Sequence, residues 1–109
     1  MNVLKNIDEI KTIVAKNKMV LLYISSESCN VCKVIFPRLM DMLKYYPQVT
    51  AVRADILELP LLSGEYNVFT IPCVLVFVDG KENLRQARFI NLDYLNEQID
   101  KSYNRFYKK

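Results

Sequence analysis

The sequence has 109 residues, 51% of them hydrophobic, which is enough for one compact domain that buries roughly 65% of its unfolded surface. A charged content of 25%, with only two Gly and four Pro, excludes disordered, collagen-like and low-complexity chains. The net charge of +3 is small and dispersed apart from a basic tail at residues 105–109, so a nucleic-acid groove is not expected. Three Cys and no His exclude every histidine-based catalytic dyad and leave thiol chemistry as the main candidate.

The N-terminal segment lacks the apolar core of a signal peptide and carries Asp8 and Glu9. The longest apolar stretch, residues 71–78, contains Pro72 and is much shorter than the roughly 20 residues of a membrane-spanning helix. An odd number of cysteines also fits a reducing compartment, because structural disulfides use cysteines in pairs. We therefore expect a cytoplasmic protein without a membrane segment.

The first half of the chain predicts helices alternating with a buried strand. Apolar residues at helical spacing indicate a helix at residues 7–16, with Asn6 as its cap. The continuous apolar run at residues 19–24 is typical of a strand buried on both faces. A long helix is expected at residues 30–46, kinked near Pro37.

The second half predicts further strands and helices that complete the domain. They are a strand at 49–54, a short helix at 60–66, a strand at 73–78, an Asp-Gly turn at 79–80, a strand at 84–90, and a final helix that Asn91 or Asp93 caps. This order predicts an α/β fold in which a mixed sheet of four to five strands is flanked by four helices. We expect residues 1–109 to form a single domain.

Two of the cysteines, Cys29 and Cys32, stand where a buried strand passes into a long helix. A thiol in the first turn of a helix faces unpaired backbone N–H groups and the positive end of the helix dipole, both of which favour the thiolate. Cys29 is therefore the predicted nucleophile. Cys32 lies one turn further and can reach back to form a disulfide, so the pair can exchange two electrons with a partner.

The segment SSESCNVCKVIFP resembles the active-site segment of thioredoxins, in which Cys-x-x-Cys-Lys is followed by a proline five residues after the second cysteine. Cys29, Cys32, Lys33 and Pro37 match that spacing. Residues 70–72 (Thr-Ile-Pro) look like the cis-proline loop of the family and are also followed by an apolar strand and an Asp-Gly turn. The resemblance covers nearly the whole chain and implies a thioredoxin fold.

The resemblance also implies roles for individual residues. Cys29 would attack a disulfide of a partner protein, and Cys32 would resolve the mixed disulfide. Pro72, in cis, would lie against the pair and present its backbone to the substrate. The other residues implied for substrate binding are Ser28, Asn30, Val31 and Ile71.

The implied activity is the reduction of protein disulfides, with a thioredoxin reductase, an NADPH-dependent flavoprotein, as electron donor. No cofactor is expected beyond the reversible Cys29–Cys32 disulfide, and neither is a metal, a nucleic acid or a membrane partner. We expect a monomer. Two other functions stay open: a thioredoxin-like binding or adaptor module whose cysteines act as a sensor, and a dedicated reductant of one enzyme such as a peroxidase.

Several positions depart from the family pattern. Ser28 replaces the tryptophan before the first cysteine, and Asn30-Val31 replaces Gly-Pro. The family places a buried acid six residues before the first cysteine, and this chain has Tyr23 at that position. Deprotonation of Cys32 would therefore depend on water, on the Tyr23 hydroxyl or on Glu27. We expect slower resolution of mixed disulfides as a result.

A further departure lies after the last strand, where residues 88–90 (Arg-Phe-Ile) stand in place of the glycine that keeps the substrate groove open. Larger side chains there should narrow the groove and restrict the choice of partner.

Two residues near the pair have alternative interpretations. Cys73 is either a small buried hydrophobe at the start of a strand or a third thiol that modulates the pair. Lys33 is either a solvated charge or a cation that lowers a neighbouring thiol pKa. A zinc site is disfavoured, because zinc takes four ligands and the chain offers only one further Cys and no His.

Overall fold

A computed structural model describes residues 1–107; residues 108–109, the end of the basic tail, lie outside the described part. Along the chain the elements are β1 (Asn2–Val3), α1 (Ile7–Lys16), β2 (Met19–Ser25), α2 (Asn30–Leu43), β3 (Thr50–Asp55), α3 (Leu61–Tyr66), β4 (Cys73–Val78), β5 (Lys81–Ala87) and α4 (Leu92–Tyr107).

The five strands form one mixed sheet in the order β1-β3-β2-β4-β5. β3 is parallel to both β1 and β2, whereas β4 is antiparallel to β2 and to β5. The mixed sheet with four helices confirms the predicted fold class. β1 was not predicted, because two residues are too few to show an alternating pattern.

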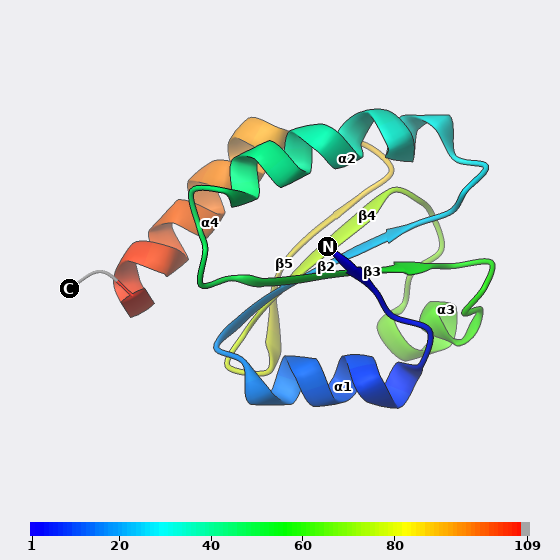
Figure 1. The fold of residues 1–109 in the computed structure, drawn as a ribbon, viewed down its shortest axis with the longest axis horizontal. Coiled ribbons are helices and arrows are strands. Elements are labelled where there is room, and N and C mark those ends of the chain that lie inside the picture. The colour runs from blue at the N-terminus through cyan, green and yellow to red at the C-terminus, as the bar shows by residue number, and fades with distance from the viewer. Residues whose placement is uncertain (108–109) are drawn as a thin grey trace.

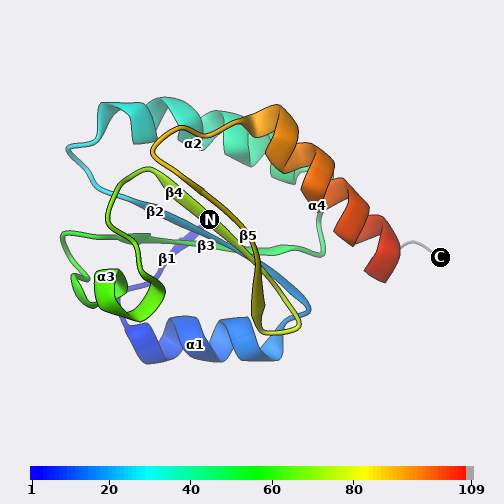
Figure 2. The same ribbon diagram turned by 180° about the vertical axis from the view of Figure 1, so that it is seen from behind.

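Helices cover both faces of the sheet. α2 and α4 lie on one face, and α1 and α3 lie on the other (Figures 1 and 2). β2 shows why its apolar run is continuous: Val20, Leu22 and Ile24 pack toward α1 and α3, while Met19, Leu21 and Tyr23 pack toward α2 and α4. Because both faces of β2 are buried from Met19 to Ile24, these six positions need largely apolar side chains, and the run ends at the half-buried Ser25.

Side chains and turns set several element boundaries. Asn6 accepts a hydrogen bond from the Glu9 backbone N–H at 3.2 Å, and Asn91 accepts one from the Tyr94 N–H at 3.0 Å. Of the two caps considered for the last helix, Asn91 is therefore the one that the structure uses. The turn Asp79-Gly80 has two positive φ angles, 51° and 80°, so β5 pairs immediately after it and begins at Lys81, three residues earlier than expected.

The predicted end of the long helix was wrong. α2 ends at Leu43 rather than at residue 46. Tyr46 precedes Pro47, which disfavours helical backbone at that position. The Tyr46 side chain is instead buried against α4, where its hydroxyl donates a hydrogen bond to Asn96 at 2.8 Å.

None of the helices within residues 1–107 is long and apolar enough to cross a membrane.

Candidate active site

Cys29 and Cys32 form a disulfide at the N-terminus of α2, with their Cα atoms 5.3 Å apart. Cys29 is the N-cap residue, and its Sγ accepts a hydrogen bond from the Cys32 backbone N–H at 3.1 Å. Cys29 is partly exposed, whereas Cys32 is only 2% exposed. Cys29 is therefore the more exposed of the two cysteines, and its sulfur lies where a helix terminus stabilises negative charge.

A short turn carries the chain from β2 to this helix. The Cys29 N–H donates to the Ser26 carbonyl at 3.2 Å, and the Ser26 hydroxyl lies 3.2 Å from that of Ser28. Ser26 is buried, whereas Ser28, Asn30 and Val31 are exposed around the disulfide. The three exposed residues are among those for which the family resemblance implies substrate binding.

Tyr23 lies beneath the disulfide, fully buried between the sheet and α2. Its hydroxyl donates a hydrogen bond to the Cys32 carbonyl at 2.7 Å, and its ring stacks on Phe36 with a centroid separation of 6.1 Å. Burial raises the pKa of Tyr23 to about 12. The phenol is therefore a neutral donor near pH 7, which makes it unsuited to accept the proton of Cys32.

A cavity of about 290 Å³ reaches Cys32 from the side of β3. Its walls include Tyr23, Phe36, Arg53 and three carboxylates, those of Glu27, Asp55 and Glu58. The Arg53 guanidinium lies 4.5 Å above the Phe36 ring, and its buried Nε has no hydrogen-bond partner among residues 1–107. Lys33, exposed on the first turn of α2, also lines this cavity.

The loop before β4 packs against the same buried cluster as the cysteine pair. The Ile71–Pro72 peptide bond is cis, and Ile71 packs against the buried cluster that contains Cys32, as Cys29 also does. The Pro72 carbonyl accepts a hydrogen bond from the Arg88 N–H at 2.7 Å. Two segments far apart in the sequence, before β4 and after β5, therefore meet at this loop.

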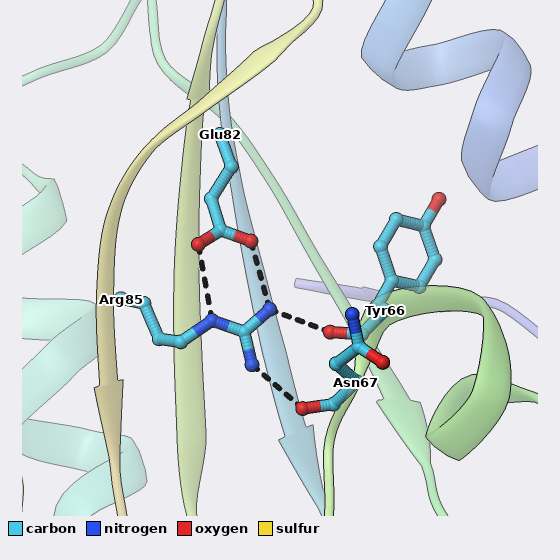
Figure 3. A network of polar contacts seen from close by, with 4 residues as sticks. All are labelled: Tyr66, Asn67, Glu82 and Arg85. Carbon is cyan, nitrogen blue, oxygen red and sulfur yellow. Dashed lines mark hydrogen bonds and ion pairs between the residues drawn. The ribbon is translucent and has the colours of Figure 1, made fainter.

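Arg85 of β5 ties the same region to α3, as Figure 3 shows. Its guanidinium donates to the Tyr66 carbonyl at 2.5 Å and to the Asn67 carbonyl at 2.8 Å, and it forms an ion pair with Glu82 at 2.8 Å. The pairing with Arg85 lowers the pKa of the Glu82 carboxyl. This network, which sequence reasoning missed, fixes the end of α3 immediately before the cis-proline loop.

Cys73 lies on the other face of the sheet. Its side chain is fully buried in the cluster under α1 and α3, whereas Cys32 belongs to the cluster under α2 and α4. Burial raises the pKa of the Cys73 thiol to about 11. The placement favours the interpretation of Cys73 as a small buried hydrophobe.

A mixed sheet between two pairs of helices, with an accessible disulfide at a helix N-terminus beside a cis-proline loop, defines a class of small thiol–disulfide exchange proteins. Comparison with known proteins is more specific. The Thioredoxin family model matches residues 2–101. The chain belongs to the thioredoxin family, and it is a thiol–disulfide oxidoreductase.

Individual relatives agree with the family assignment, and solved structures agree with the fold. The chain is 30% identical to Thioredoxin-like protein YdfQ of Bacillus subtilis over 100 residues, which are 92% of this chain and 89% of that protein. It is 34% identical to a thioredoxin of Chlamydia trachomatis, over 76% of this chain and 81% of the relative. Its fold matches oxidised mitochondrial thioredoxin 3 from Saccharomyces cerevisiae, with a TM-score of 0.83 and 24% identity over 93% and 94% of the two chains.

A chain from a solved structure also matches this fold; that structure concerns the thiol-resolving mechanism in yeast mitochondrial 1-Cys peroxiredoxin via glutathione/thioredoxin systems. The TM-score is 0.86 with 23% identity, over 93% of this chain and 94% of the matched chain.

Proposed function

We propose that this protein reduces disulfide bonds of other proteins by a dithiol mechanism, with Cys29 as nucleophile and Cys32 as resolving residue. One observation supports the assignment of roles: Cys29 is partly exposed and its sulfur accepts a hydrogen bond from the Cys32 N–H at the N-terminus of α2, while Cys32 is buried. Such a position stabilises a thiolate and leaves it open to a partner.

The reaction proceeds in two exchanges. The Cys29 thiolate attacks one sulfur of the substrate disulfide, so that a mixed disulfide forms and the other substrate sulfur leaves as a thiolate. The Cys32 thiolate then attacks the Cys29 sulfur, which closes the Cys29–Cys32 disulfide and releases the second substrate thiolate. Two electrons pass from the protein to the substrate, and the thiolates take up protons from water.

Cys32 must lose its proton before the second exchange. The cavity beside Cys32 supports a route through water to the carboxylates in its wall, Glu27 among them. Tyr23 instead holds the Cys32 carbonyl and so positions the first turn of α2. Lys33, in the wall of the same cavity, has the role of a solvated cation.

The electron donor that we propose is a thioredoxin reductase, and the substrates are protein disulfides bound against Ile71, Pro72 and the exposed residues around Cys29. We further propose that residues 1–109 act as a single domain, a monomer in the cytoplasm that contributes to redox homeostasis and needs no cofactor beyond its own disulfide. The single sheet shared by all five strands supports the single domain.

A second candidate function is that of a dedicated reductant for one partner, such as a peroxidase. The observation that favours it is Arg88, whose N–H binds the Pro72 carbonyl and which belongs to the segment 88–90 that stands near the place of the family's groove glycine. A binding module without turnover is the remaining alternative.

The test is reduction of a model protein disulfide, insulin, with dithiothreitol as reductant. We expect turnover by wild type and by the matched control Cys73→Ser, and none by Cys29→Ser. Cys32→Ser, which stops after the first exchange, should trap mixed disulfides with cellular partners. Absence of turnover by wild type would overturn the proposal, and many trapped partners would exclude the dedicated reductant.

A further inference from the structure

Arg88 has an unusual backbone conformation. Three non-glycine residues within 1–107 have positive φ: Asn67, Asp79 and Arg88. Asn and Asp tolerate left-handed backbone, and these two lie at a helix C-terminus and in a hairpin turn, whereas Arg has no such tolerance at its φ of 70°. Local turn chemistry therefore does not explain why an arginine occupies this position, and strained residues of this kind concentrate at functional sites.

The guanidinium of Arg88 is available to a partner. It is exposed, lies 5.2 Å from the centroid of the Phe89 ring, and forms no ion pair within residues 1–107. Arg85, on the same segment, is the opposite case, because two backbone carbonyls and Glu82 occupy its donors. The Arg85 guanidinium is therefore held by contacts within the fold, whereas no ion pair within residues 1–107 holds that of Arg88.

Arg88 lies beside the cis-proline loop. Its N–H binds the Pro72 carbonyl, and the connection from β5 to α4 runs beside the first half of α2 in both views (Figures 1 and 2). Phe89 is 78% exposed and Val31, between the two cysteines, is 57% exposed. The three carboxylates of the cavity beside Cys32 lie toward β3, on the other side of β2 from β5, whereas Arg88 and Phe89 supply an exposed cation and an exposed apolar ring; the next acid after Arg88 along the chain is Asp93, in the first turn of α4.

We propose that Arg88 and Phe89 select disulfide substrates that carry an Asp or Glu beside the attacked cysteine, in an extended segment of a partner protein. Arg88 pairs with the carboxylate, and Phe89 packs against the neighbouring apolar side chain. This inference rests on the proposed reduction of protein disulfides and names the substrate class. Charge complementarity of this kind discriminates between partners more than it adds to affinity.

The experiment uses short peptides whose single cysteine is joined to thionitrobenzoate as a mixed disulfide. Asp, Asn or Lys flanks the cysteine on both sides, so that either direction of binding is sampled. Attack by Cys29 on the peptide sulfur releases coloured thionitrobenzoate, which gives the second-order rate constant. The ratio of rate constants between peptides cancels any effect of a variant on the reactivity of Cys29 itself.

For wild type at low salt we expect the Asp peptide to react about tenfold faster than the Lys peptide, with the difference shrinking in ~0.5 M salt. Arg88→Glu should invert the preference. Arg88→Gly, which suits the positive φ and so preserves the fold, should bring the two rates within about twofold of each other. Lys81→Gln, at the far end of β5, removes a cation of the same strand and should leave the wild-type ratio unchanged.

Equal rates for all three peptides with wild type would overturn the inference, and so would a preference that survives Arg88→Glu. Failure of the proposed function is a separate result, since it appears as absence of insulin reduction by wild type.

Discussion

Replacing Tyr23 by Phe removes the hydroxyl that donates to the Cys32 carbonyl at 2.7 Å and leaves the buried ring in place. A buried hydrogen bond of this kind contributes about 1 kcal/mol to the free energy of unfolding. For 109 residues, that loss lowers the Tm by about 4 °C near neutral pH.

The difference in free energy of unfolding between wild type and Tyr23→Phe depends on pH, because burial raises the pKa of Tyr23 from 10.0 to about 12. A raised phenol pKa means that folding favours the protonated form, so its contribution is complete below pH 10 and is lost as the pH rises toward 12. The loss is about 1.4 kcal/mol per pH unit within that window. The stability advantage of wild type over Tyr23→Phe should therefore vanish near pH ~10.7 and reverse above it.

The assay is urea unfolding of both reduced proteins at pH 7 and pH 11, with Tyr45→Phe as matched control because Tyr45 is 78% exposed. Stopped-flow measurement of the second exchange should show Tyr23→Phe within about twofold of wild type, since a neutral donor does not accept the Cys32 proton. A stability difference that stays constant between the two pH values would refute the reasoning about burial. A much slower second exchange would refute the reasoning about the proton.

Three further outcomes are expected. Arg88→Gly should raise the free energy of unfolding by about 0.5–1 kcal/mol because it relieves left-handed backbone, and a lower urea midpoint would contradict this. Arg85→Ala should lower the free energy of unfolding by about 1–3 kcal/mol. Because Arg85 holds the end of α3 before the cis-proline loop, the substitution should also raise the KM for insulin more than it lowers kcat; an effect on kcat alone would argue against this role. Iodoacetamide at pH 8 should alkylate Cys29 of the folded reduced protein and spare Cys73, whose thiol is buried with a pKa of about 11; early modification of Cys73 in mass spectra would contradict its placement.

Much of the fold could be predicted because its signals are local. The apolar run of β2, the Asn6 cap and the Asp79-Gly80 turn each specify an element through neighbouring residues, and the structure confirms all three. The end of α2 was misplaced because the periodicity of apolar residues continues to Tyr46, although the backbone cannot remain helical before Pro47.

Only part of the candidate active site could be predicted from the sequence. The spacing of Cys29 and Cys32 carries its own chemistry, so the pair could be found without the fold. Two partners of Arg85, on the α3 side, are backbone carbonyls, which have no residue signature, and the distance in sequence between Arg85 and Tyr66 hides the contact. The donor role of Tyr23 likewise depends on a long-range distance, whereas the sequence offered only a hydroxyl near a cysteine.

The two edges of the sheet have a consequence for behaviour at high concentration. β1 is only two residues long, and β5 has charged side chains at Lys81, Glu82 and Arg85 and an irregular register opposite Val76 and Phe77. Short or charged edges are poor templates for the addition of a foreign strand. The most apolar strands, β2 and β4, are enclosed between their neighbours, so edge-to-edge aggregation requires opening of the fold.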